Sequence, residues 1–132
     1  MRGYIAVTPE LIGQFQSAGK FHFESAFITT RAFFEDNPEV DEEEREFDLS
    51  WLAAVESREI QGSDELLGFV LAVDITSAQA GEEIGYQIQL QSPLDWSQIE
   101  SLLVAESSDA ELTWYASQEI SENLAGWIGA GD

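Results

Sequence analysis

The stretch LLGFVLAVDI, residues 66–75, constrains the fold more than any other feature, because it is apolar almost throughout. A strand with one wet face alternates apolar and polar residues, whereas a continuous apolar run of this length is typical of a strand buried on both faces. We therefore predict a central strand here, in a sheet that helices cover.

The rest of the chain carries alternating strand and helix signals. A β-rich or alternating pattern predicts further strands at 3–7, 25–30, 84–91 and 101–107, with a polar loop at 76–83 and another at 61–65. Helices are predicted between Thr8 and Gly19, within 92–100 and around Ile120, Leu124, Trp127 and Ile128. This order predicts an α+β single domain over 1–132, with a mixed, mostly antiparallel sheet of about five strands covered by helices.

A second constraint is FFEDNPEVDEEEREFDLSW, residues 33–51, which contains nine carboxylates and one arginine. Asp41 and Glu44 have the spacing of a capping box, and the residues after them are spaced as in an amphipathic helix. We predict a long acidic helix over 39–59, after a short turn of helix. The aromatic and apolar residues expected to anchor this segment to the core are Phe33, Phe34, Phe47, Trp51, Ala54 and Val55.

The carboxylates of this segment permit two interpretations. Acidic residues in a first helical turn complement the helix dipole, and the remainder can simply be solvated. Alternatively, the surplus forms a surface for a basic protein partner. The candidate partner-binding residues are Glu35, Asp36, Glu39, Asp41, Glu42, Glu43, Glu44 and Glu46.

The charge of the whole chain narrows the classes of partner. Twenty-six acidic residues face five basic ones, for a formal net charge of −21. Nucleic acids and anionic lipids are bound by clustered Lys and Arg, which this chain lacks, whereas a negative field attracts basic proteins. No apolar run approaches the roughly 20 residues that span a bilayer. We expect a cytoplasmic protein without direct nucleic-acid or membrane binding, although solubility or a salty cytoplasm also accounts for such acidity.

Catalytic and metal-binding signals are weak. Cysteine is absent and His22 is the sole imidazole, three residues before Ser25 without a nucleophile-elbow motif. Glu24, Glu82 and Glu83 could act as acid–base carboxylates, but acids are so abundant that this signal is not specific. The acidic run lacks the EF-hand pattern, and no phosphate-binding glycine loop is present. We predict no catalytic residue, cofactor or metal, and favour a non-enzymatic protein.

The segment ELTWYASQEI, residues 111–120, is the other stretch of the sequence that suggests a binding site. Trp114 and Tyr115 are consecutive, so they point in different directions in either a strand or a helix. One interpretation places one of them in the core and the other at its edge. The alternative is a small enzyme or ligand-binding domain with a pocket at Trp114, Tyr115, Gln118 and Glu119.

The start MRGYIAVTPELIGQF and the tail LTWYASQEI resemble an uncharacterised actinobacterial family of small acidic cytoplasmic proteins. Its members have an M-R-x-Y start and a W-Y-A-x-Q-E tail, with Thr30 here at a position where relatives tend to carry Pro. The resemblance implies a shared cytoplasmic domain of unknown function and attaches no role to the tail residues.

From these features we expect a regulatory or adaptor protein that binds a basic protein, with a nucleic-acid mimic as a sharper variant. Its oligomeric state is not predicted.

Overall fold

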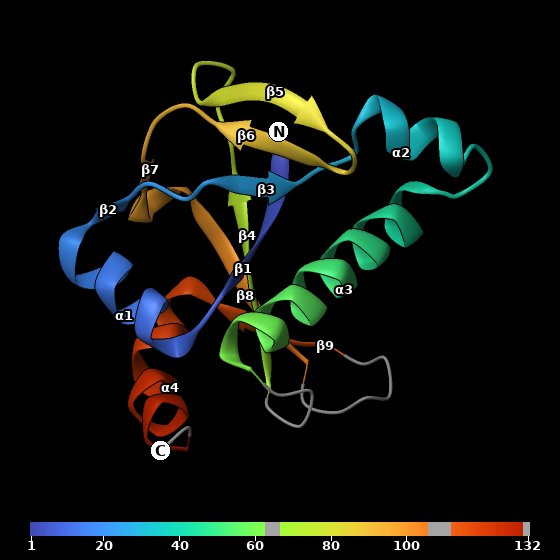
Figure 1. Ribbon diagram of the computed structural model, residues 1–132. Helices are drawn as coiled ribbons and strands as arrows, with labels where there is room; N and C mark the ends of the chain where they lie inside the picture. Colours follow the sequence, from blue (N-terminus) through green and yellow to red (C-terminus); the bar gives the residue numbers. More distant parts are fainter. Residues whose placement is uncertain (63–66, 106–111, 131–132) are drawn as a thin grey trace.

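Seven antiparallel strands form the main sheet of the computed structural model, which describes residues 1–62, 67–105 and 112–130 (Figure 1). The prediction of an α+β fold with an antiparallel sheet covered by helices is confirmed. A small second sheet pairs β2 (Lys20–Phe21) with β7 (Leu94–Asp95). In spatial order the main sheet consists of β5 (Ala80–Ile84), β6 (Gln87–Leu90), β3 (Ser25–Phe27), β1 (Arg2–Val7), β4 (Gly68–Asp74), β8 (Ile99–Ala105) and β9 (Leu112–Ala116).

Helices cover both faces of this sheet (Figure 1). On one face lie α1 (Pro9–Ala18) and α4 (Ser117–Ala130); on the other lie α2 (Arg31–Asp36) and α3 (Glu42–Gln61). Strand β4 is buried between them: Leu71 contributes to the core under α1 and α4, and Val70 to the core under α3. The prediction of a strand buried on both faces is therefore confirmed, for the described residues of that run.

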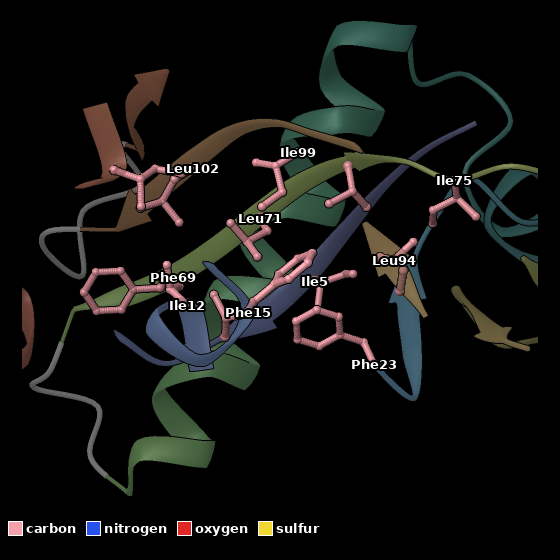
Figure 2. Close-up of a cluster of buried hydrophobic side chains, with 14 of the residues drawn as sticks. Ile5, Ile12, Phe15, Phe23, Phe69, Leu71, Ile75, Leu94, Ile99 and Leu102 are labelled. Atoms are coloured by element: carbon pink, nitrogen blue, oxygen red, sulfur yellow. The ribbon is translucent and has the colours of Figure 1, made fainter. Parts of the chain in front are cut away.

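The core on the α1 face is built around aromatic rings (Figure 2). Phe15 is fully buried, and its ring centroid lies 5.4 Å from that of Phe23 and 5.1 Å from that of Trp96, both edge-on. Helix α1 presents Phe15 here because Thr8 caps its first turn and Gly19, with φ of 78°, ends it. Both helix-end signals in the sequence are thus confirmed.

Helix α3 differs from its prediction in the face it buries. Asp41 caps it by accepting a hydrogen bond from the Glu44 amide at 2.8 Å, so the helix begins at Glu42 rather than 39 and ends at Gln61. Phe47 and Val55, expected in the core, are 40% and 38% exposed. The buried residues of the helix are Leu49, Ser50, Ala53, Ala54, Ser57 and Arg58.

Small residues explain this rotation of α3. A Cβ at Gly68 of β4 would lie 2.7 Å from the Ala54 carbonyl oxygen, so helix and strand are in close backbone contact. The Ser57 hydroxyl donates to the Val7 carbonyl at 2.6 Å and accepts from the Phe69 amide at 2.9 Å. These contacts need small side chains at 54 and 57, where helix and strand are closest, and Phe47 and Val55 lie on the sides of the helix. Phe34 on α2, another predicted anchor, is likewise 46% exposed, whereas Phe33 is buried.

The segment 76–91 forms a hairpin rather than a loop followed by one strand. Strands β5 and β6 pair across a turn at Gly85, whose φ of 61° is left-handed. The predicted strand at 84–91 is therefore split, and part of the predicted polar loop is β5. The strand predicted at 25–30 ends at Phe27, because the Thr30 side chain caps α2 by accepting from the Phe33 amide.

The remaining predicted elements agree with the structure where it describes them. The short helix within 92–100 is a 3-10 turn, Trp96–Gln98, with a capping box between Asp95 and Gln98. The predicted C-terminal helix is α4, with Ile120 and Leu124 buried. Part of the loop at 61–65, residue 66 of the central strand and the end of the strand at 101–107 lie outside the described residues.

Candidate functional site

A groove lies beside the N-terminal half of α3, over the end of the sheet formed by β1, β8 and β9. Helix α3 packs mainly on β4 and β1, so the same face of β8 and β9 is left partly uncovered. The groove has a volume of about 520 Å³. We call it the α3–β9 groove; its apolar wall is formed by Phe47, Leu103, Leu112 and Trp114, and its carboxylates are Glu43, Glu46 and Glu100.

The wall of the groove exposes aromatic surface to solvent. Trp114 is 60% exposed and lies directly across from Leu103 in the β8–β9 ladder, so both point toward the α3 side. Phe47 stacks on Trp51, with ring centroids 6.3 Å apart and planes 12° apart. Two segments singled out in the sequence, the acidic helix and the Trp114 segment, therefore meet at one groove.

One guanidinium already occupies the floor of this groove. Arg2 donates from Nε and Nη2 to the two oxygens of Glu100 and from Nη1 to Glu46, all at 3.1 Å. The hydrogen bond to Glu100 is the main cause that raises the pKa of Arg2 above its ordinary value. Glu43, the third carboxylate of the groove, is exposed and makes no ion pair with a described residue.

Tyr4 lies next to this ion pair and is only 4% exposed. Burial raises the pKa of its phenol to about 12, and the nearby Glu46 carboxylate acts in the same direction. The unfolded chain would release this proton near pH 10, before the folded chain does. Stability from Tyr4 is therefore present below about pH 10 and is lost as pH rises toward about 12.

We accordingly predict that Tyr4 titrates late, near pH 12, in an alkaline absorbance titration. The Tyr4→Phe variant should lack this late step, and its unfolding free energy should fall less steeply with pH above about pH 10. Since a hydrogen bond to Asp36 also raises the pKa of Tyr86, Tyr86→Phe is the matched control. An unchanged late step in Tyr4→Phe would contradict the assignment.

The eight candidate partner-binding carboxylates fall into two groups. Three are engaged within the fold: Asp36 accepts from the Tyr86 hydroxyl at 2.6 Å, Asp41 caps α3, and Glu46 pairs with Arg2. The carboxylates of the others are exposed and make no hydrogen bond or ion pair within the described part of the chain. These are Glu35, Glu39, Glu42, Glu43 and Glu44.

The four candidate pocket residues lie in different places. Trp114 lines the groove, but Tyr115 points to the opposite face, where its ring centroid lies 5.1 Å from that of Trp127 on α4. The Glu119 side chain accepts from the Ala116 amide at 3.0 Å and so caps the start of α4. Gln118 is exposed. The structure therefore brings Trp114 together with α3 and not with the other three.

The weaker catalytic candidates also have defined positions. His22, Glu24 and Glu82 line another surface hollow, of about 580 Å³. His22 lies 3.0 Å from the Leu90 carbonyl, and the Ser25 hydroxyl donates to Gln87 at 2.5 Å, so no Ser–His pair is formed. Within 1–62, 67–105 and 112–130, no three His, Asp or Glu side chains are placed to hold a metal ion, and no helix is long and apolar enough to cross a membrane.

Sequence reasoning missed several residues of the groove. Arg2 and Tyr4 are two apart in a strand and so share a face, which the sequence could have indicated. No sequence pattern indicated that Glu100 belongs to the groove, because its position beside Arg2 depends on the order of the strands in the sheet. Phe47 was noticed but was assigned to the core.

The fold and the groove define an acidic α+β domain with an aromatic-lined groove beside an acidic helix. The chain belongs to the family of unknown function DUF6912, which matches residues 1–111. No curated protein and no solved structure matches the chain significantly. The family match ends before β9, so the WYASQE segment lies beyond it.

Proposed function

We propose that this chain is a non-enzymatic regulatory or adaptor protein that binds a basic protein partner through its α2–α3 segment. The observation that carries this proposal is the set of exposed carboxylates on α2, α3 and the loop between them that have no partner within the described fold. They adjoin the exposed rings of Phe34 and Phe47. Carboxylates next to aromatic faces suit Lys and Arg, which bind both groups.

Helix stability does not account for all of these charges. Glu42, Glu43 and Glu44 lie in the first turn of α3, where negative charge complements the dipole. Glu35, by contrast, lies near the C-terminal end of α2, where negative charge is unfavourable, and Glu39 lies in the loop between the helices. Charges that lie where they do not stabilise the fold support a role in binding.

The proposal also covers the kind of partner surface, the cellular location and the origin of the chain. The partner surface can be one that otherwise binds nucleic acid, with the acidic segment acting as a mimic of the phosphate backbone. The net charge and the exposed acidic surface support a cytoplasmic location. The resemblance at the M-R-x-Y start and at the W-Y-A-x-Q-E tail supports an actinobacterial origin for this chain.

Affinity capture from lysate tests the proposal. We expect wild-type protein to retain basic proteins at low salt and to release them at high salt, because exposed ion pairs are screened. The triple variant Glu42→Gln, Glu43→Gln, Glu44→Gln should lose them. Its control, Glu10→Gln, Glu82→Gln, Glu122→Gln, changes the net charge equally at exposed sites elsewhere and should retain them. Capture of the same proteins by both triple variants would overturn the role of α3.

A further inference from the structure

The two edges of the main sheet differ in how well they are protected. At one edge, β5 carries Glu82 and Glu83, and its register with β6 shifts between Ala80 and Glu83. Charges and bulges of this kind keep an edge strand from pairing with another chain. At the other edge, β9 has the sequence LTWYA, without charge, proline or a register shift against β8. Of the strands that the structure describes, β9 is the last in this order.

The side chains of β9 alternate between a wet and a covered face. Leu112 and Trp114 point into the α3–β9 groove, and Tyr115 points toward α4, where it contacts Trp127. A strand added beside β9 would lie about 4.8 Å away, and its alternate side chains would extend the same two faces. On the groove side they would meet the exposed ring of Trp114 with Glu43 nearby. On the other side they would continue the apolar surface of Tyr115.

The negative charge of this chain favours a basic segment, rather than a second copy of the chain, as the strand that pairs with β9. A second copy of the chain would bring two net charges of −21 together. A segment with basic residues at alternate positions would instead place them over Trp114 and near the groove carboxylates, where cation–π and ionic attraction act together. Arg2, bound by Glu46 and Glu100, shows that this groove holds a guanidinium.

We propose that β9 is a docking edge at which an extended segment of the basic partner, with Lys or Arg at alternate positions, adds as a further antiparallel or parallel strand. This inference rests on the proposed function and specifies how the partner binds. Main-chain hydrogen bonds to β9 provide the affinity, and the α3–β9 groove selects basic side chains on one face, as in other cases of strand addition.

The test uses the full chain and a synthetic peptide of alternating arginine and valine, followed by NMR and calorimetry at low salt. We expect shifts in the amide signals of 112–116 and in the Trp114 indole signal, and slower hydrogen exchange at those β9 amides that do not donate to β8.

Variants of the protein and of the peptide separate the two parts of the proposal. Trp114→Ala should weaken peptide binding on the order of tenfold. The same peptide with N-methyl groups along one backbone edge should no longer bind, because it cannot complete the ladder. Ile84→Ala, an exposed apolar side chain on β5 at the opposite edge of the sheet, is the control and should leave binding unchanged.

The outcomes separate this inference from the proposed function. Equal binding of the methylated and unmethylated peptides, sensitive to the α3 triple variant, would overturn strand addition and leave the acidic binding surface standing. Binding of neither peptide, with basic proteins still captured, would have the same effect. Failure of both the peptide and capture would overturn both proposals. A dimer in the absence of peptide that Trp114→Ala dissociates would assign the edge to a second copy and overturn the inference.

Discussion

Replacing Phe15 with alanine is expected to lower the free energy of unfolding by about 3–5 kcal/mol. Phe15 is fully buried, beside Phe23 (Figure 2). Its ring contacts those of Phe21, Phe23 and Trp96, with centroid distances of 5.1–6.4 Å. Truncation removes apolar surface from the core and leaves a cavity that α1 and the neighbouring strands can only partly fill. Urea unfolding followed by far-UV circular dichroism measures the change.

Phe34→Ala is the matched control for this prediction. Phe34 is 46% exposed and its ring lies under Arg45, with 4.8 Å between the guanidinium carbon and the ring centroid. The change should cost no more than about 1 kcal/mol, the upper range for exposed cation–π contacts. If Phe15→Ala and Phe34→Ala were equally stable, the placement of Phe15 at the centre of this core would be wrong.

The second large effect is expected at Gly68, where α3 and β4 are closest. A Cβ at this position would lie 2.7 Å from the Ala54 carbonyl oxygen and 3.2 Å from the Ala54 Cβ. Gly68→Val therefore requires helix and strand to separate, which would also strain the hydrogen bonds of Ser57 to Val7 and Phe69. We expect a loss of about 3 kcal/mol, typical of overpacking in a rigid core.

Gly126→Val provides the comparison for Gly68→Val. Gly126 lies in α4, and a Cβ there would meet nothing within 4 Å. Valine and glycine have similarly low helix propensities, so this variant should change stability by less than about 0.5 kcal/mol. A small effect at Gly68, similar to that at Gly126, would show that α3 does not pack closely on β4.

The strength of local signals decided how much of the fold was predictable. The run at 66–75 is almost continuously apolar over the length of a single strand, and so it predicted a strand buried on both faces. Thr8 and Gly19 act through hydrogen bonds and backbone angles within a few residues, and so they predicted both ends of α1 correctly. Asp41 caps α3 as its spacing to Glu44 indicated, although the predicted start at 39 was three residues too early.

Packing between distant segments explains what the sequence did not show. The buried face of α3 is set by the close approach at Gly68 and Ala54, so the larger residues Phe47 and Val55 are exposed although they suggested a core stripe. Strand β5 was missed because Glu82 and Glu83, which protect an edge strand, also resemble a polar loop.

The candidate site was predictable in its parts but not in its assembly. The acidic segment and Trp114 were both recognised, each from its own composition. That Glu43 and Phe47 face Trp114 across a groove depends on β9 following β8 at the edge of the sheet, and periodicity does not determine strand order. Tyr115 was separated from Trp114 by the alternation of a strand, one of the two geometries considered from the sequence.

The central claim is that carboxylates of α3, rather than net charge in general, bind a basic partner. The most direct measurement is calorimetry of the arginine–valine peptide at low and moderate salt, with wild type and the two triple variants that carry equal net charge. We predict that the α3 triple variant (Glu42→Gln, Glu43→Gln, Glu44→Gln) binds the peptide more weakly and with a smaller salt dependence than wild type. The control triple variant (Glu10→Gln, Glu82→Gln, Glu122→Gln) should change both quantities far less. Equal weakening by the two would contradict the claim, because binding would then follow the charge of the whole molecule.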